Sequence, residues 1–458
     1  TPTRRQRQMC IRDRFIVDHK HRDLAASALI GFYLKKDGYE VAYCAPWHED
    51  KIVKEFSPNI IVLPKPIYKN HIFASWKIND IKVAVNDVEG NLQQKEFGFL
   101  KPKIFPDQYF YWNEIFYERQ GEFFEKEQNG FTGKAPERIL IGCPRIDFLH
   151  PKFDSVNKTK KELLNEFIIP SDKKIITIAT AGSSADLSDE DLHKVQENVN
   201  TRNSNPPDVF LEASIYRELR EMTVKIIEEV AANFPQYHVV LKPHPNEVPK
   251  FWVDLVEEKN LKNITIMKSG TINDLLNLAD IHMAHNVCTS TFEAMIKRVP
   301  SIEMQTERSK ILFSEKDLKL PLFPVKNADE ALRSISKIED ERNKCTDKGF
   351  LLANEFCEKW YGKFDGKRCL EYAENIKKLS NKKILLSKLS KTKMYFRFII
   401  GNEISKLMGK FQRLSIKKIF EKVKGIKQKD WTDERHDKTI QPGDEKFWFE
   451  KFKKIIND

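Results

Sequence analysis

The sequence predicts an α/β protein with two Rossmann-like domains that face one another across a cleft. Short apolar, β-rich runs alternate with helical segments of about 10 to 15 residues, which is typical of βαβ units around a parallel sheet. This alternation occurs twice along the chain, and a mixed connector separates the two series. The length agrees, because 458 residues suffice for about two to three domains of ordinary size.

The first series is expected over residues 15–150. A short apolar run begins at Phe15, and apolar residues at helical spacing follow as far as Gly38, a typical helix terminator. Further strands are expected at 40–46, 59–66 and 81–87, and residues 138–149 complete the series.

The second series is expected over residues 172–345, after a linker at 151–171. Strands are expected at 175–181, 237–245, 263–270, 280–286 and 299–304, and helices at 214–235, 273–279 and 290–298. The strand at 175–181 is expected to end in the small polar loop AGSSADLSDED, and we interpret the long polar stretch that follows, to about Pro207, as an inserted surface loop. Residues 346–380 are expected to form closing helices, and residues 381–458 a basic amphipathic helical tail.

The composition excludes several classes of protein. An apolar fraction of 40% indicates a globular chain, and no run approaches the roughly 20 apolar residues of a membrane span. The seven cysteines are scattered and never form CxxC, which favours a reducing compartment over a disulfide framework or zinc site. The absence of GxGxxG, GxxxxGK[ST], GxSxG and HExxH removes the positive signals for dinucleotide oxidoreductases, P-loop NTPases, α/β hydrolases and zincins.

The net charge of +11 is concentrated in one segment. Residues 381–429 carry 15 Lys and Arg against Glu403 and Glu421, a local charge of +13. The first 14 residues add five Arg against Asp13, so the rest of the chain has a net charge of −6. No nucleic-acid partner is therefore expected, since the basic segment also lacks a recognition motif.

Residues 1–14 are expected to be a non-native leader. They show no hydrophobic periodicity and no apolar region behind their arginines, which excludes a secretory signal, and they resemble translated sequencing-adapter sequence. A disordered basic arm is the alternative interpretation.

Carboxylates follow the strand predicted at 81–87. Asp87 and Glu89, beside Gly90, are candidates for a general base, since burial at a strand end can raise a carboxyl pKa towards neutrality. A solvated acidic turn is the alternative. His19 and Asp23, at the start of the first helix, are candidates for acceptor binding, and a metal site there is disfavoured.

A histidine between two prolines follows the apolar run YHVVL at 237–241. The flanking prolines restrict His244 to extended or turn geometry and hold its imidazole at the mouth of the cleft. There, with Lys242 and Pro245, it can bind a phosphate or protonate a leaving group. A structural histidine that caps the turn is the alternative.

A predicted helix start forms a third candidate cluster. Thr289, Ser290 and Thr291 are good N-cap residues, and a helix N-terminus favours a phosphate. Glu293 in the first turn can accept hydrogen bonds from ribose hydroxyls. Simple helix capping is the alternative. The small-residue loop at 180–184, which includes Ser183, is a weaker candidate for ligand contact.

Taken together, these clusters resemble a group of GT-B glycosyltransferases. The chain looks like the bacterial surface carbohydrate biosynthesis proteins and, more distantly, the CMP-sialic acid and CMP-Kdo transferases and CDP-glycerol glycerophosphotransferases. The resemblance covers Phe15 to Leu379 and rests on four segments: Glu89–Gly90, His244–Pro245, Ser290–Thr291, and Gly142, Pro144, Arg145 and Asp147 in IGCPRID. Val88 departs from the pattern, because the CMP-sugar enzymes carry a second acid there. Either Asp87 or Glu89 therefore stays open as the base.

The resemblance implies an inverting, metal-independent glycosyltransferase of surface polysaccharide biosynthesis. Its donor would be a nucleotide-activated sugar, with a CMP-sugar favoured, held by His244, Ser290 and Thr291, and no other cofactor would be obligatory. The acceptor would be a glycan or lipid-linked glycan. The alternatives are a CDP-glycerol or CDP-ribitol polyol-phosphate transferase and a catalytically inactive GT-B assembly partner.

The basic segment predicts a location. Lys and Arg in 381–429 are interleaved with apolar clusters at partly helical spacing, and basic amphipathic helices bind anionic membrane surfaces. We therefore expect a cytoplasmic protein that is peripheral on the inner face of the cytoplasmic membrane. A solvated helical hairpin is the alternative.

Overall fold

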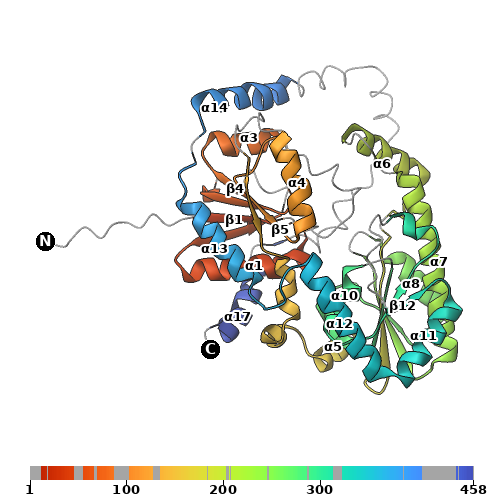
Figure 1. The fold of residues 1–458 in the computed structure, drawn as a ribbon. Coiled ribbons are helices and arrows are strands. Elements are labelled where there is room, and N and C mark those ends of the chain that lie inside the picture. The colour runs from red at the N-terminus through yellow and green to blue at the C-terminus, as the bar shows by residue number, and fades with distance from the viewer. Residues whose placement is uncertain are drawn as a thin grey trace. The chain divides into compact units, whose positions relative to one another are not determined.

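The computed structural model describes residues 12–17, 19–45, 55–65, 70–86, 103–126, 135–182, 184–202, 206, 208–244, 247–285, 288–312, 322–384, 386–404, 440–441 and 443–456. The chain divides into two compact units (Figure 1). Among its described residues, unit 1 comprises those up to 86, 103–145 and 367–456, and unit 2 comprises 146–366. The described residues after 366, which the sequence analysis separated as closing helix and tail, thus belong to the N-terminal unit.

Unit 1 contains a six-stranded parallel sheet in the order β2-β1-β3-β4-β5-β6. Its strands are β1 (Arg12–Ile16), β2 (Glu40–Cys44), β3 (Ile60–Leu63), β4 (Lys82–Asn86), β5 (Gln108–Tyr111) and β6 (Glu137–Leu140). The strand order reverses direction between β1 and β3. Ligands of such sheets bind at this kind of switch point, beyond the carboxyl ends of the strands.

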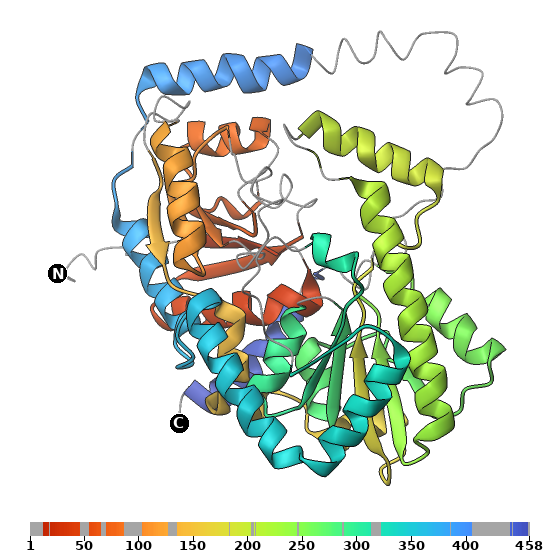
Figure 2. The same cartoon turned by 45° about the vertical axis from the view of Figure 1, so that its right-hand side comes forward.

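Helices cover both faces of the unit 1 sheet because its crossovers run in opposite directions from β1. α1 (Lys20–Lys36) and α13 (Arg368–Asn381) contact each other on one face, whereas α3 (Asn70–Ile78) and α4 (Glu114–Lys126) cover the other (Figure 2). The 3₁₀ turn η2 (Pro144–Leu149) spans the chain boundary between the two units.

The described C-terminal elements also pack on unit 1. α14 (Lys388–Met394) continues as the π-helical η5 (Tyr395–Ile400), and both contact α3. α17 (Asp444–Ile456) packs on α1, where Phe449 and Phe452 are buried near the ring of Phe32. α17 therefore contributes aromatic side chains to the core of unit 1.

Unit 2 contains a second six-stranded parallel sheet, in the order β12-β11-β10-β7-β8-β9. Its strands are β7 (Lys174–Ala179), β8 (Tyr237–Lys242), β9 (Ile264–Ile266), β10 (Ile281–His285), β11 (Ser301–Met304) and β12 (Phe323–Val325). Counted from β7, this is the 3-2-1-4-5-6 order of dinucleotide-binding sheets, with the switch point between β7 and β10.

The strands of unit 2 are buried on both faces. α7 (Val209–Asn233), α8 (Lys250–Glu258) and α11 (Ala328–Asp340) pack with β7, β8 and β10 in one apolar cluster that includes Ile176, Ile226 and Trp252. α5 (Lys160–Glu166) and α9 (Ile272–Leu278) cover the other face, where Ile175 and Ala284 are buried. α10 (Thr289–Ile296) contacts β10, β11 and α12 (Arg342–Trp360), and the short turns η3 (Pro151–Val156) and η4 (Ser309–Leu312) complete the unit.

Two segments were wrongly predicted. Residues 12–14, expected to belong to a leader outside the fold, form the start of β1 between β2 and β3. Residues expected to form a surface loop before Pro207 instead contain the helix α6 (Asp189–Arg202). Acidic residues in its first turn favour the helix dipole, and the Ser188 hydroxyl accepts a hydrogen bond from the backbone N–H of Asp191. Leu192 anchors this otherwise polar helix against Val209 and Ala213. Because so few apolar residues of α6 are buried, the apolar residues in its sequence do not recur clearly at helical spacing, and the helix was not predicted.

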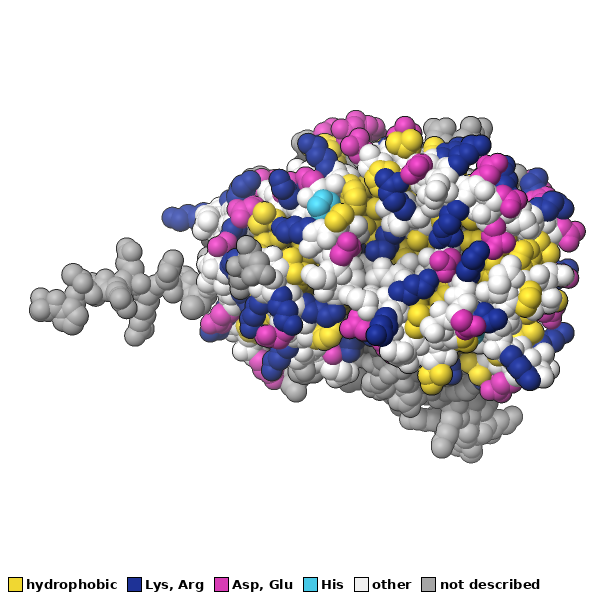
Figure 3. Space-filling model, turned by 90° about the horizontal axis from the view of Figure 1, so that it is seen from below, with side chains coloured by type: hydrophobic (Ala, Val, Ile, Leu, Met, Phe, Trp, Pro, Cys, Tyr) yellow, Lys and Arg dark blue, Asp and Glu magenta, His cyan; other side chains and the backbone are white. Residues whose placement is uncertain are grey.

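The surface carries charges of both signs. In the face drawn in Figure 3, Lys and Arg side chains are interspersed with Asp and Glu. Among the described residues, none of the helices has the length and apolar character needed to cross a bilayer.

Candidate functional site

The sequence-predicted donor residues that the structure describes lie at the carboxyl ends of the unit 2 strands. Lys242 ends β8 and His244 follows it, whereas Thr289, Ser290, Thr291 and Glu293 begin α10 after β10. Because β7 lies between β8 and β10 in a parallel sheet, both groups belong to the same edge, beside the switch point. The predicted residues Ser183 and Pro245 lie outside the described part of the chain.

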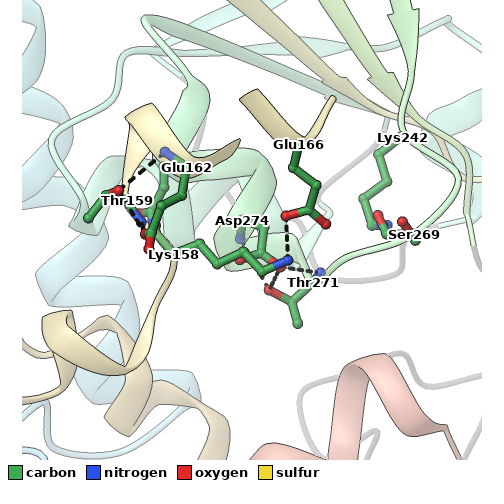
Figure 4. A network of polar contacts seen from close by, with 9 residues as sticks. Lys158, Thr159, Glu162, Glu166, Lys242, Ser269, Thr271 and Asp274 are labelled. Atoms are coloured by element: carbon green, nitrogen blue, oxygen red, sulfur yellow. Dashed lines mark hydrogen bonds and ion pairs between the residues drawn. The ribbon is translucent and has the colours of Figure 1, made fainter. Parts of the chain in front are cut away.

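The turn that follows β8 is fixed by hydrogen bonds to the loop after β7. The backbone N–H of His244 donates to Thr180 Oγ1 over 3.1 Å. The Thr180 hydroxyl in turn donates to Glu247 Oε2 over 2.7 Å. Lys242 Nζ donates to the Ser269 carbonyl over 3.2 Å, which joins the end of β8 to the loop after β9 (Figure 4). The side chains of Lys242 and His244 are both partly exposed.

A buried histidine lies at the switch point. The backbone N–H of Ala181 donates to His285 Nδ1 over 3.1 Å, and Thr223 Oγ1 lies 2.6 Å from His285 Nε2. The Thr223 hydroxyl also donates to the Leu219 carbonyl, and His285 Nδ1 lies 3.3 Å from the Ala181 carbonyl. Burial lowers the pKa of His285 to about 4, so the ring is neutral near pH 7.

The start of α10 is held from below by a second buried histidine. His282 Nδ1 lies 2.9 Å from Thr177 Oγ1, and its Nε2 lies 3.0 Å from Ser290 Oγ. Burial lowers the pKa of His282 to about 3. The Ser290 hydroxyl also donates to Cys288 Sγ over 3.2 Å. Ser290 is thus a buried anchor of the helix start, and its side-chain oxygen already has partners.

Other hydroxyls at this edge are buried with unused hydrogen-bonding capacity. Thr291 Oγ1 and Ser184 Oγ have no hydrogen-bond partner among the described residues. Thr291 begins the helix α10, and Ser184 lies in the loop after β7. Glu293 is also buried in the first turns of α10. Polar groups buried at a strand edge are suited to bind a ligand with several acceptor and donor atoms.

The neighbouring helix starts are capped by their own side chains. In Figure 4, Thr159 with Glu162 and Thr271 with Asp274 form reciprocal capping boxes at α5 and α9. α10 differs, because the side chain of its N-cap residue Cys288 accepts no hydrogen bond from a backbone N–H of the helix. The alternative for residues 289–291 was simple helix capping. The N-cap residue of α10 makes no side-chain capping hydrogen bond, so the structure gives that alternative no support at the N-cap.

The predicted acceptor residues lie at the switch point of unit 1. His19 is the N-cap of α1, and its backbone N–H donates to Asp23 Oδ2 over 3.2 Å. Arg22 binds both carboxylate oxygens of Asp23, at 2.9 and 3.0 Å. Asp23 is buried and serves to fix the helix start. Asp87, Glu89 and Gly90, which follow β4, lie outside the described residues.

The IGCPRID segment is shaped by α13. Gly142 has a φ of +105°, which favours glycine, and its carbonyl accepts from the Tyr372 hydroxyl over 3.1 Å. Arg368 binds the Ile141 carbonyl over 2.6 Å, and the Arg145 guanidinium lies 5.3 Å from the Trp112 ring centroid. Residues 141–145 of this segment are thus held in place within unit 1.

Sequence reasoning included Thr180 in the candidate loop at 180–184 but missed Glu247 and His285. His285 could have been found, since it ends the strand at 281–285 beside the predicted cluster. Glu247 could not, because its partner Thr180 is 67 residues away in the sequence. Among the described residues, no group of His, Cys, Asp and Glu side chains is placed to hold a metal ion.

Neither a protein-family model nor a curated protein sequence matches this chain. Solved structures match it in fold. The H548A variant of the wall teichoic acid polymerase TagF has a TM-score of 0.51 at 12% identity, covering 81% of this chain and 89% of that one. The unmodified TagF structure has a TM-score of 0.50 at 13% identity, over 81% and 88%. UDP-GlcNAc 2-epimerase from Neisseria meningitidis, bound to UDP-GlcNAc, has a TM-score of 0.49 at 13% identity, over 81% and 100%.

The likenesses to the two TagF structures show the fold. Two α/β units with parallel sheets, and helices at the C-terminus, form a GT-B-like architecture, as the sequence predicted.

Proposed function

We propose that this protein is a glycosyltransferase that uses a nucleotide-activated sugar, with a CMP-sugar favoured, in the synthesis of a bacterial surface polysaccharide such as capsule or lipopolysaccharide. The observation that carries the proposal is the convergence of His244, Lys242 and the start of α10 at the switch-point edge of the unit 2 sheet. An edge of this kind binds nucleotides in doubly wound folds.

In this mechanism, a carboxylate of Asp87 or Glu89 takes the proton of an acceptor hydroxyl. The hydroxyl oxygen attacks the anomeric carbon of the donor sugar as the bond from that carbon to the phosphate oxygen breaks, which inverts the configuration. His244, Lys242 and the backbone N–H groups at the start of α10 stabilise the charge on the departing phosphate, so no metal or other cofactor is needed. The acceptor is a glycan or a lipid-linked glycan, bound on the side of Gly90, His19 and Asp23.

A polyol-phosphate transferase is the second candidate. In that reaction an acceptor hydroxyl attacks phosphorus, and CMP leaves from a CDP-glycerol or CDP-ribitol donor. A wall teichoic acid polymerase has a similar fold, and one of its variants was soaked with CDPG. The same His244 and α10 region would bind this donor. A catalytically inactive assembly partner is the remaining alternative.

Calorimetric titration with CMP, CDP, UDP and their sugar or alditol conjugates tests the proposal. We expect CMP-sugars to bind most tightly, and His244→Ala to weaken binding at least tenfold, since it removes a contact with a charged phosphate. His193→Ala is the matched control, because His193 is exposed on α6 and contacts Phe210. A preference for CDP-alditols would select the second candidate. Failure to bind any nucleotide would reject both enzymes.

We also propose that residues 381–429 place the enzyme on the anionic inner face of the cytoplasmic membrane. Met394 and Phe398 are buried in the α14–η5 segment that packs on α3, whereas Leu389 and Phe396 are 64% and 63% exposed beside Lys393 and Arg397. Exposed apolar and basic side chains on one helix favour an anionic lipid surface. Residues 405–429 lie outside the described part of the chain.

Vesicle sedimentation tests this membrane proposal. A truncation after Leu379 would also delete α17, so point variants are preferable. The double variant Leu389→Gln/Phe396→Gln should lose most binding to phosphatidylcholine vesicles that contain phosphatidylserine, while nucleotide binding persists. Leu351→Gln is the matched control, since Leu351 on α12 is also 64% exposed. Equal sedimentation of the double variant and the wild-type chain would refute the proposal.

A further inference from the structure

The loops after β7 and β8 are joined through a buried carboxylate. Glu247 Oε2 accepts two hydrogen bonds, from the Thr180 hydroxyl over 2.7 Å and from Trp252 Nε1 over 3.1 Å. Glu247 is 4% exposed, and Trp252 belongs to the apolar core beneath α8. The carboxylate therefore connects a strand-end loop to a rigid part of the unit.

The direction of each hydrogen bond in this chain is determined. The Thr180 hydroxyl has one proton, which it donates to Glu247, so its oxygen is left as an acceptor. The backbone N–H of His244 donates to that oxygen over 3.1 Å, and the N–H of Glu247 donates to the His244 carbonyl over 2.8 Å. The carboxylate thus fixes the orientation of the hydroxyl that holds the backbone of His244.

The surrounding loop is shaped to fit the same carboxylate. A Cβ atom at Gly182 would lie 3.2 Å from Glu247 Oε1, so even an alanine would be crowded there. Asp186, in the same loop, binds Arg220 over 2.7 Å and accepts from the backbone N–H of Val248 over 3.3 Å. The two loops therefore meet at three places around residues 247 and 248.

A buried carboxylate is costly to maintain unless its hydrogen bonds repay the desolvation. Burial raises the pKa of Glu247, whereas the hydrogen bonds from Thr180 and Trp252 act in the opposite direction. An apolar residue would fill this space beside Trp252 at lower cost. The hydrogen bonds that join Glu247 to Thr180 and Trp252 give a carboxyl group a role here that an apolar side chain could not fill.

We infer that Glu247 is a positioning residue, which holds the His244 turn in its phosphate-binding geometry through the hydroxyl of Thr180. The inference rests on the proposed function, in which His244 contacts the donor phosphate. Glu247 itself does not touch the donor. Its effect passes through Thr180, so removal of either the carboxylate or the hydroxyl should weaken nucleotide binding in the same way.

A double-mutant cycle on nucleotide affinity tests the inference. CDP is the probe, and its dissociation constant is measured by calorimetry for the full chain. We expect Glu247→Met, which keeps the approximate size but removes the acceptors, to weaken CDP binding about tenfold. In the His244→Ala background the same substitution should change affinity by less than about twofold, because residues that act through one another are not additive.

Conservative variants separate positioning from folding. Glu247→Gln can still accept from Thr180 and Trp252, so it should retain most of the affinity that Glu247→Met loses. Thr180→Val should reproduce the Glu247→Met effect, and Thr180→Ser should not. If Glu247→Met does not fold, Thr180→Val and Thr180→Ser can be compared instead, each in the wild-type protein and in the His244→Ala variant, and they provide the same double-mutant cycle.

A matched carboxylate at the opposite edge of the strands is the control. Glu339 accepts from Lys174 Nζ over 2.9 Å and from the Tyr237 hydroxyl over 3.0 Å, at the first residues of β7 and β8. Glu339→Met should lower the melting temperature but leave CDP affinity unchanged. Equal losses for Glu247→Met in both His244 backgrounds would overturn the positioning role alone. If the wild-type chain does not bind CDP, CMP or UDP, or if His244→Ala binds as the wild type does, the proposed function itself fails.

Discussion

Asp13 is a buried acid in the middle of a parallel sheet. It lies in β1, paired with Val41 of β2 and Ile60 of β3, and is 0% exposed. Neither of its carboxylate oxygens has a hydrogen-bond partner among the described residues. Burial raises the pKa of Asp13 to about 8, with Lys82 acting in the opposite direction. Between about pH 4 and pH 8, the Asp13 carboxyl group is therefore protonated in the folded protein but ionised in the unfolded chain.

This placement predicts an unusual loss of stability with rising pH. Between the unfolded pKa of 3.8 and the folded value of about 8, the native state binds the extra proton. The free energy of unfolding should thus fall as pH rises, by up to roughly 1.4 kcal/mol per pH unit. Asp13→Val should stabilise unit 1 at pH 8 and remove this dependence. Urea unfolding of the wild-type protein and of Asp13→Val at pH 5 and pH 8 measures this dependence. If the free energy of unfolding changes equally with pH in the two proteins, Asp13 is not the group responsible.

At the scale of elements, strands and long amphipathic helices could be predicted, because their patterns are local. β8 and α7 lie where the apolar runs and helical spacing indicated. α6 was missed because it buries only a narrow stripe around Leu192. The docking of α17 was also not predicted, since the aromatic partners of Phe449 and Phe452 lie on α1, more than 400 residues earlier in the sequence.

In the candidate site, too, local features could be predicted from the sequence and long-range contacts could not. Strand-end position and the flanking prolines identified His244, and the start of α10 was found from its N-cap residues. The structure changes the role of Ser290, whose hydroxyl is joined to His282. That contact arises because His282 faces α10 on one side of β10 while His285 faces α7 on the other. Side-chain alternation along a strand is visible in the sequence, but the helix that covers each face is not.

For the whole molecule, the two units should respond to acid in opposite directions. Burial lowers the pKa of His282 to about 3 and of His285 to about 4, and with Lys173 it lowers that of His238 to about 4. All three histidines belong to unit 2. They bind fewer protons in the folded state than in the unfolded chain, so unit 2 loses stability as pH falls from about 6.5 to about 4. Over the same range, protonation of Asp13 stabilises unit 1.

Calorimetric unfolding at pH 7 and pH 5 should reveal this difference. The transition that Asp13→Val shifts identifies unit 1, and the remaining transition should move to lower temperature on acidification. His282→Asn removes one titrating ring and should reduce the acid sensitivity of unit 2 by up to roughly 1.4 kcal/mol per pH unit. His193→Asn is the control, since His193 is exposed on α6. If unit 2 is equally stable at both pH values, the lowered pKa values assigned to the three buried histidines are wrong.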